Sequence, residues 1–264
     1  MNKLKNKKLF LLDMDGTIYL GDKLFDGTYD FLNHIKEIGG RYMFLTNNSS
    51  KSVDAYIQKL DKMGIKSTKD DFLTSTDATI YFLKKKNHKK IYALGTNSFK
   101  EQLKSDNLPI TDKLEDDIDC LCMGFDTELT FKKLEDACIL LNKDIDYIAT
   151  NPDWVCPTSF GSVPDCGSIS SILKNATGKM PYFIGKPQPL MVELAVEKSD
   201  FTKEETVLMG DRLYTDIACG INADISTIFV LSGEGTMEDV EKNSEKPEYI
   251  FENIRALYNF LKEK

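Results

Sequence analysis

The sequence contains few prolines and few histidines, no low-complexity tract and no long apolar run. With only 8 prolines and 41% hydrophobic residues, its composition is typical of globular proteins and excludes fibrous and disordered classes. Nowhere do apolar residues continue for the ~20 positions that a membrane-spanning helix needs, and the apolar stretch before Asp13 is shorter than the ~7 residues of a signal-peptide core. We therefore expect a soluble, cytoplasmic protein with no membrane partner.

Paired cysteine motifs are also missing. No Cys-X-X-Cys pair occurs, and a chain of 264 residues is too large to depend on disulfides. A zinc site at Cys120 and Cys122 would have only two histidines in the whole chain to complete it. The pattern favours reduced, buried thiols, as in a cytoplasm. The six cysteines are Cys120, Cys122, Cys138, Cys156, Cys166 and Cys219.

Positive charge is in deficit. The formal net charge is −8, and no stripe of Lys and Arg alternates with aromatic residues. An acidic surface opposes attraction to phosphate backbones, so we expect no nucleic-acid partner. The run from Lys84 to Lys90 is interpreted as a solvated helix end.

Short β-rich runs alternate with segments of helical period. "YMFLTNN" precedes "SSKSVDAYIQKLDKMGI", in which Ser50 or Ser52 can cap a helix and Gly64 can end it. "YFIGK" and "TVLMGDR" are likewise each followed by a helical pattern. This alternation predicts an α/β fold with a doubly wound, mostly parallel sheet.

Four apolar runs switch abruptly to polar residues: "LFLLDMD", "YMFLTNN", "YFIGK" and "TVLMGDR". If all four are strands of one parallel sheet, their ends meet at the carboxyl edge, where open α/β sheets bind ligands. Any one of these tails read alone is more typical of a turn. The residues predicted to converge are Asp13, Asp15, Thr46, Asn47, Asn48, Lys186, Asp211 and Asp216.

Such a cluster of carboxylates requires a cation. Two carboxylates ~4 Å apart repel by about 4 kcal/mol at an effective dielectric constant of ~20. Ligands that are all oxygen atoms, with positions left open for water and substrate, favour Mg²⁺. Together with a lysine and with the donors of Thr46 and Asn47, the ion would form a receptor for a phosphoryl group. The expected partner is therefore a small phosphorylated metabolite.

Histidine is not available for proton transfer. His34 lies in a helical pattern and His88 in a basic run, and neither adjoins a strand tail. Acid/base chemistry then falls to a carboxylate, and an aspartate can serve as the nucleophile. Asp15 is the candidate acid, because the negative charge of Asp13 two positions away would raise its pKa.

The motifs "DMDGT", "TNN", "GKP" and "GDRLYTD" resemble, in order, the four motifs of the haloacid dehalogenase (HAD) superfamily of phosphatases. "TNNSS", "ATNPDWVCP", "GKPQPLM" and "GDRLYTDIACG" are similar to its NagD and 4-nitrophenylphosphatase subfamily, over nearly the whole chain. The resemblance implies a HAD-like, Rossmannoid core, an inserted α/β cap domain and a homodimer joined through the caps. Asp15 argues against dehalogenase activity itself.

The resemblance also implies a role for each motif residue. Asp13 would be the nucleophile and a Mg²⁺ ligand, and Asp15 the acid/base that binds Mg²⁺ through its backbone carbonyl. Thr46, Asn47 and Asn48 would bind the phosphoryl group. Lys186 would neutralise nucleophile and phosphate, Asp211 would be a side-chain metal ligand, and Asp216 would orient Lys186 or a metal-bound water.

More than a hundred residues separate "TNN" from "GKP", too many for a loop. They carry strand candidates of their own, which predicts a core of residues 1–75 and 180–264 and a cap of residues 76–179. The cap should govern substrate choice. The segment from Thr150 to Ser168, with Trp154 and Phe160, either faces the leaving group or braces the junction.

These observations predict a Mg²⁺-dependent phosphatase that hydrolyses small phosphate monoesters through an aspartyl-phosphate. Nucleotide and sugar phosphates are candidate substrates, with 4-nitrophenyl phosphate as a generic one. A phosphotransferase or phosphomutase with the same residues is the alternative. A phospho-receiver signalling module shares several residue types, but it is about half this length and has no inserted domain.

Overall fold

The computed structural model describes residues 2–158 and 160–263. The chain divides into two compact units, the first formed by Met1–Thr46, Tyr56–Leu73 and Lys186–Lys264. The second unit comprises Asn47–Ala55 and Thr74–Gly185. The predicted domain division at 75/76 and 179/180 stays a prediction.

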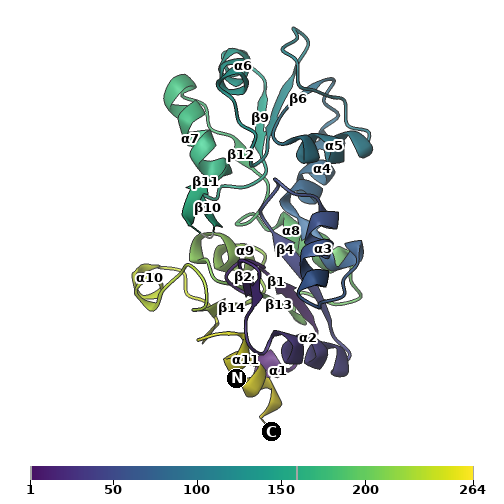
Figure 1. The fold of residues 1–264 in the computed structure, drawn as a ribbon, viewed down its shortest axis with the longest axis vertical. Helices are drawn as coiled ribbons and strands as arrows, with labels where there is room; N and C mark the ends of the chain where they lie inside the picture. Colours follow the sequence, from purple (N-terminus) through teal and green to yellow (C-terminus); the bar gives the residue numbers. More distant parts are fainter. Residues whose placement is uncertain (1, 159, 264) are drawn as a thin grey trace. The chain divides into compact units, whose positions relative to one another are not determined.

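A six-stranded sheet forms the centre of the first unit, in the order β15-β14-β13-β1-β4-β5. Figure 1 labels β14, β13, β1 and β4 of this sheet. The pairings of β1 with β13 and β4, and of β14 with β13 and β15, are parallel. Every residue of β1 is fully buried, as expected for a strand covered on both faces. The strands are β1 (Leu9–Leu12), β4 (Arg41–Thr46), β5 (Phe72–Thr74), β13 (Thr206–Gly210), β14 (Ser226–Val230) and β15 (Tyr249–Phe251).

The strand order reverses at β1. From β1 the chain proceeds to β4 and β5 on one side, whereas β13, β14 and β15 extend on the other. Open α/β sheets hold their ligands outside the carboxyl ends of the strands at such a switch point. The topology therefore directs attention to the residues that follow β1 and β13.

Helices and one hairpin complete this part of the chain. The helix α2 packs against α11 and β4, and the π-helical turn η2 packs against β13 and β14. The hairpin joins β2 (Tyr19–Leu20) and β3 (Lys23–Leu24). The helical segments outside residues 74–185 are α1 (Asn2–Lys5), α2 (Thr28–Glu37), α3 (Val53–Lys62), η1 (Lys69–Asp71), α8 (Leu190–Glu197), η2 (Leu213–Ile217), α9 (Ala218–Asn222), α10 (Met237–Lys242) and α11 (Ile254–Lys262).

The helix α3 shows how the sequence sets its own boundaries. The Ser52 hydroxyl accepts a hydrogen bond from the backbone N–H of Ala55 at 3.4 Å, which satisfies a donor of the first turn. Gly64 has φ +86°, the left-handed conformation that commonly follows a helix end. The predicted helix is confirmed, with Ser52 as its capping residue.

The second unit has a sheet of its own, in the order β12-β9-β8-β6-β7 with parallel pairing. An apolar cluster that includes Leu121, Met123 and Leu140 fills its core. The strands of this sheet are β6 (Ile91–Leu94), β7 (Ile110–Thr111), β8 (Cys120–Met123), β9 (Asp146–Ala149) and β12 (Tyr182–Phe183). A separate hairpin joins β10 (Val155–Thr158) and β11 (Gly161–Pro164). Its helices are α4 (Ser75–Lys86), α5 (Asn97–Ser105), α6 (Phe131–Leu141) and α7 (Cys166–Thr177).

Both sheets confirm the predicted α/β class, but one strand assignment was wrong. The run "YFIGK" was expected to join the same sheet as the other three motif strands. Instead β12 pairs with β9, and the backbone N–H of Gly185 continues this pairing by donating to Thr150 O at 2.8 Å. A two-residue strand carries no pattern that selects one sheet over another, so long-range pairing decided its place.

No helix of residues 2–158 and 160–263 combines the length and the apolar character needed to cross a bilayer. All six cysteines are free thiols, and four of them are buried. Burial raises the pKa of the Cys122 thiol to about 12, consistent with an unreactive structural residue.

Candidate active site

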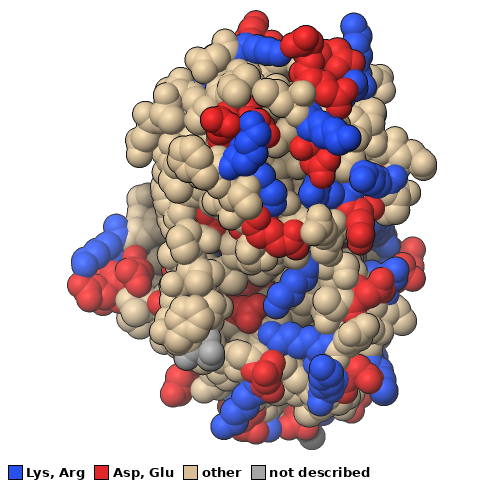
Figure 2. Space-filling view, turned by 45° about the horizontal axis from the view of Figure 1, so that its top comes forward, with Lys and Arg blue, Asp and Glu red and all other residues tan. Residues whose placement is uncertain are grey.

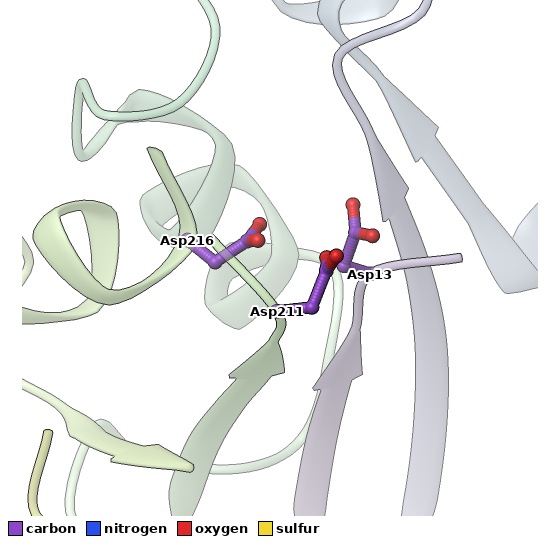
Figure 3. A group of neighbouring side chains, drawn as sticks. All are labelled: Asp13, Asp211 and Asp216. Carbon is purple, nitrogen blue, oxygen red and sulfur yellow. The ribbon is translucent and has the colours of Figure 1, made fainter. Parts of the chain in front are cut away.

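Asp13 and Asp211 come from neighbouring strands at the switch point. Leu12 of β1 is in register with Met209 of β13, and the backbone N–H of Asp13 donates to Met209 O at 2.9 Å. Each aspartate therefore follows the paired end of its strand, and Figure 3 shows the two side chains next to each other. The predicted convergence of these distant carboxylates is observed.

Asp216 brings a third carboxylate from the π-helical turn η2 (Figure 3). Its Oδ2 accepts a hydrogen bond from the N–H of Arg212 at 3.1 Å. Gly210 makes this approach possible, since a Cβ at that position would lie 2.2 Å from Asp216 Cγ. One oxygen each from Asp13, Asp211 and Asp216 lies within 4.8 Å of the others.

Lys186 joins these carboxylates although its preceding strand belongs to the other sheet. Its Nζ lies 2.6 Å from Asp13 Oδ1 and 2.6 Å from Asp216 Oδ1, and it also donates to Leu45 O at 3.1 Å. The side chain is 2% exposed. Burial alone would lower the pKa of Lys186, but the charges of Asp13 and Asp216 outweigh it and raise the pKa above its usual value.

Burial disfavours the ionised forms of Asp13 and Asp211. Burial raises the pKa of Asp13 well above its usual range, opposed by Lys186 and reinforced by Asp216 and Asp211. Burial and the negative charge of Asp216 raise the pKa of Asp211 to about 7. Burial is the main cause of both shifts, and the neighbouring carboxylates add to it.

The residues present fit a divalent cation. With three carboxylates and one ammonium, two negative charges remain unbalanced when all four groups are ionised. Asp211 Oδ1 is buried and has no hydrogen-bond partner among the described residues. Ligands that are all oxygen match a hard ion such as Mg²⁺, and the orphaned oxygen provides a ligand position.

Asp15 lies in a different setting from Asp13. Its Oδ2 accepts a hydrogen bond from the Tyr19 hydroxyl at 3.3 Å, and its Oδ1 lies 3.8 Å from Lys59 Nζ. The same ammonium lies 3.7 Å from the centroid of the Tyr19 ring. The side chain is 41% exposed and is not part of the three-carboxylate group. Local partners, and not only the proximity of Asp13, thus define its environment.

The predicted phosphate-binding residues are divided by the fold. Thr46 ends β4 next to β1 and is buried. Asn47 and Asn48 belong to the second unit, where Asn47 Nδ2 donates to Asp153 Oδ2 at 2.6 Å. Asn48 Oδ1 accepts hydrogen bonds from the N–H and the hydroxyl of Ser50. Their contact with a phosphoryl group stays a prediction.

Each of the two histidines has a carboxylate neighbour outside the three-carboxylate group. His34 is buried in α2 and lies 3.8 Å from Glu37. His88 lies in the second unit, with Nε2 2.7 Å from Asp146 Oδ2. Trp154 and Phe160 are exposed, at 53% and 80%. These positions leave the role of the segment from Thr150 to Ser168 as a prediction.

Sequence reasoning missed the turn that follows β14. The backbone N–H of Glu234 donates to Asp211 Oδ2 at 2.7 Å, and Gly233 packs directly against the same carboxylate. The signal was present in "STIFVLSGEG", a further apolar run that ends abruptly in small and polar residues. Its tail contains no Asp, Asn or Lys, the residue types that distinguish the tails of the four motif runs.

Two family models match the chain. Residues 10–108 match the model described as haloacid dehalogenase-like hydrolase, and residues 183–257 match the HAD-hydrolase-like model. The acid sugar phosphatase of Staphylococcus haemolyticus is 33% identical over 259 residues, which is 98% of this chain and 98% of that protein.

Solved structures are similar over nearly the whole chain. The 4-nitrophenylphosphatase from Thermotoga maritima has a TM-score of 0.91 at 42% identity, covering 97% of this chain and 98% of that one. NagD from E. coli K-12 has a TM-score of 0.85 at 28% identity, covering 94% and 97%. The glycerol phosphate phosphatase from Mycobacterium tuberculosis, in complex with magnesium, has a TM-score of 0.90 at 27% identity, covering 97% of this chain and 77% of that one.

Proposed function

The chain belongs to the haloacid dehalogenase-like hydrolases, in the NagD and 4-nitrophenylphosphatase subfamily, and from this premise we propose that it is a Mg²⁺-dependent phosphatase of small phosphate monoesters. The observation that carries the proposal is the meeting of Asp13, Asp211, Asp216 and Lys186 at the switch point of the sheet. An acidic oxygen cluster with one buried ammonium is suited to hold a cation and a phosphoryl group together.

Asp13 is the proposed nucleophile. One of its carboxylate oxygens attacks phosphorus while the bond from phosphorus to the ester oxygen breaks, which leaves an aspartyl-phosphate. Lys186, 2.6 Å from Asp13 Oδ1, keeps a positive charge next to the oxygens that carry negative charge during transfer. Asp216 holds the lysine in place through its own 2.6 Å contact.

Asp15 is the proposed acid and base. It protonates the departing ester oxygen and then takes a proton from the water that attacks the aspartyl-phosphate, so the enzyme returns to its starting state. Water attack releases inorganic phosphate and frees Asp13. The Tyr19 hydroxyl and the Lys59 ammonium contact the two oxygens of the Asp15 carboxylate and so restrict its orientation.

Asp13 and Asp211 are the proposed side-chain ligands of the metal, with the Asp15 carbonyl as a further ligand. When bound, Mg²⁺ supplies positive charge to the phosphoryl oxygens and lowers the repulsion between the carboxylates. A relative of known structure carries magnesium in one complex and calcium in another, which supports a divalent ion. Thr46, Asn47 and Asn48 are proposed to donate to the phosphoryl group.

The proposed substrates are sugar phosphates and similar small metabolites, with 4-nitrophenyl phosphate as a generic substrate. The names of the similar proteins support this range. On the face shown in Figure 2, Lys and Arg are interspersed with Asp and Glu, and the net charge of the chain is −8. This distribution favours small ligands over a nucleic-acid backbone.

The test is free-phosphate release across a panel of phosphorylated metabolites, with Mg²⁺ and with a chelator. Hydrolysis with Mg²⁺, its loss with the chelator and its loss in Asp13→Asn are expected, because the metal and the nucleophile are both required. Asp26→Asn, which alters an exposed surface carboxylate, is the matched control and should hydrolyse at the wild-type rate. Undiminished turnover in Asp13→Asn would refute the nucleophile, and transfer to a sugar hydroxyl would favour a phosphotransferase.

A further inference from the structure

The turn Ser232–Gly235 lies at the same sheet edge as the proposed metal ligands. It follows β14, the strand next to β13, and so approaches Asp211 from the side opposite β1. The backbone N–H of Glu234 donates to Asp211 Oδ2 at 2.7 Å, and the N–H of Gly235 donates to Asp211 O at 3.1 Å. One carboxylate oxygen is thus occupied, while Oδ1 has no partner among the described residues.

Gly233 has no side chain where one would collide with this carboxylate. A Cβ at Gly233 would lie 1.9 Å from Asp211 Oδ2 and 2.4 Å from its Cγ. Asp211 is 3% exposed, so its short side chain has little room to move away. The glycine is therefore required for the observed direction of the carboxylate.

Further contacts fix the turn itself. The Ser232 hydroxyl donates to Gly16 O at 2.7 Å, and Glu234 Oε2 accepts a hydrogen bond from Arg212 Nε at 2.8 Å. Gly16, at φ +86°, closes a second side, since a Cβ there would lie 2.4 Å from Asp211 Oδ2. Gly16, Gly233 and the Glu234 N–H surround the Asp211 carboxylate. Together they fix the rotation of the side chain and therefore the direction of Oδ1.

We propose that the turn Ser232–Gly235 is a positioning element for the divalent cation. The Glu234 N–H holds Oδ2 of Asp211 by a hydrogen bond, which directs Oδ1 toward the ion. The inference rests on the metal site of the proposed function and adds residues that the sequence motifs do not contain. Groups that orient a metal ligand in this way typically affect metal affinity by about 10- to 100-fold.

The first test is Gly233→Ala, measured by calorimetric titration of chelator-stripped protein with Mg²⁺. The dissociation constant should rise about 10- to 100-fold, because the new methyl group displaces Asp211. At saturating Mg²⁺ the kcat should return toward the wild-type value, and circular dichroism of the metal-free variant distinguishes weaker metal binding from a folding defect. An unchanged dissociation constant would overturn the proposal.

The second test separates the main-chain donor from the side chain at position 234. Glu234→Pro removes the N–H, and Glu234→Ala keeps it as the matched control. Mg²⁺ should bind more weakly to the proline variant than to the alanine variant, which loses only the side-chain contact with Arg212 Nε. Equal losses in both variants would contradict a role for the N–H, and circular dichroism establishes that each variant is folded.

The outcomes distinguish this inference from the proposed function. If wild type binds Mg²⁺ and hydrolyses esters but the variants bind Mg²⁺ equally well, only the inference fails. If wild type binds Mg²⁺ without hydrolysing any ester, the proposed function fails and the titrations still decide the role of the turn. A wild-type protein without affinity for divalent ions would overturn both.

Discussion

Replacing Lys186 by methionine should destabilise the protein strongly in the absence of metal. The ammonium lies 2.6 Å from oxygens of both Asp13 and Asp216, and the side chain is 2% exposed. At this distance and an effective dielectric constant of ~20, Coulomb's law gives about 6 kcal/mol of attraction for each contact. Burial of the ammonium offsets part of this attraction, and loss of one partner from a buried ion pair costs about 3–5 kcal/mol.

The assay is thermal unfolding in a chelator, so that metal binding does not contribute. A loss of about 3–5 kcal/mol corresponds to a lower melting temperature by on the order of 10 °C. Adding Asp216→Asn to Lys186→Met should restore part of the loss, since it removes one of the two carboxylates left unpaired. This partial rescue tests repulsion directly, because a simple packing defect would not respond to it.

Lys132→Met is the matched control. Lys132 also contacts two carboxylates, Glu135 at 2.9 Å and Asp136 at 3.0 Å, but its side chain is 67% exposed. Exposed ion pairs contribute little, so this variant should melt close to wild type. The reasoning is refuted if Lys186→Met melts together with wild type, or if Asp216→Asn lowers the melting temperature of Lys186→Met further.

Two further predictions concern proton transfer and pH. Asp15→Asn should reduce kcat/KM, which reports formation of the aspartyl-phosphate and departure of the leaving group, by about 10²- to 10⁴-fold for an alkyl phosphate. The loss of kcat/KM should be far smaller for 4-nitrophenyl phosphate, whose leaving group departs without a proton. Equal losses of kcat/KM on both substrates in one preparation would contradict the acid role. Burial lowers the pKa of His34, so the unfolded chain binds a proton at a higher pH than the native protein does, and stability should fall as the pH falls below about 6.5. His34→Gln should lose less stability than wild type between pH 7 and 5 in urea unfolding, and identical losses would rule out His34 as the cause.

Particular elements show why some of this protein is readable from sequence. The run "LFLLDMD" is fully buried from Leu9 to Leu12 and turns polar at Asp13, so strand, burial and site position are all encoded within seven residues. "TVLMGDR" behaves in the same way, and parallel pairing of the two strands then brings Asp13 and Asp211 together. Local pattern and simple topology are sufficient at these positions.

The sheet to which β12 belongs and the partners of Asp15 could not be predicted from the sequence, because they depend on long-range packing. The strand β12 has two residues and joins the sheet of the second unit, yet Lys186 three residues later contacts Asp13. The partners of Asp15 are Tyr19, four residues away, and Lys59 on α3. Sequence spacing gave no indication that Lys59 contacts Asp15, because this contact depends on how α3 packs.

The sequence by itself determined the α/β class, the acidic strand ends and the family, because these depend on local periodicity and on short motifs. Only the tertiary structure decided the sheet to which β12 belongs, the separation of Asp15 from the other carboxylates, and the enclosure of Asp211 by Gly233 and Glu234. Each of these depends on contacts between segments far apart in the chain. The direction of a side chain depends on the residues that pack against it, and residues distant in the chain come into contact only when the chain folds.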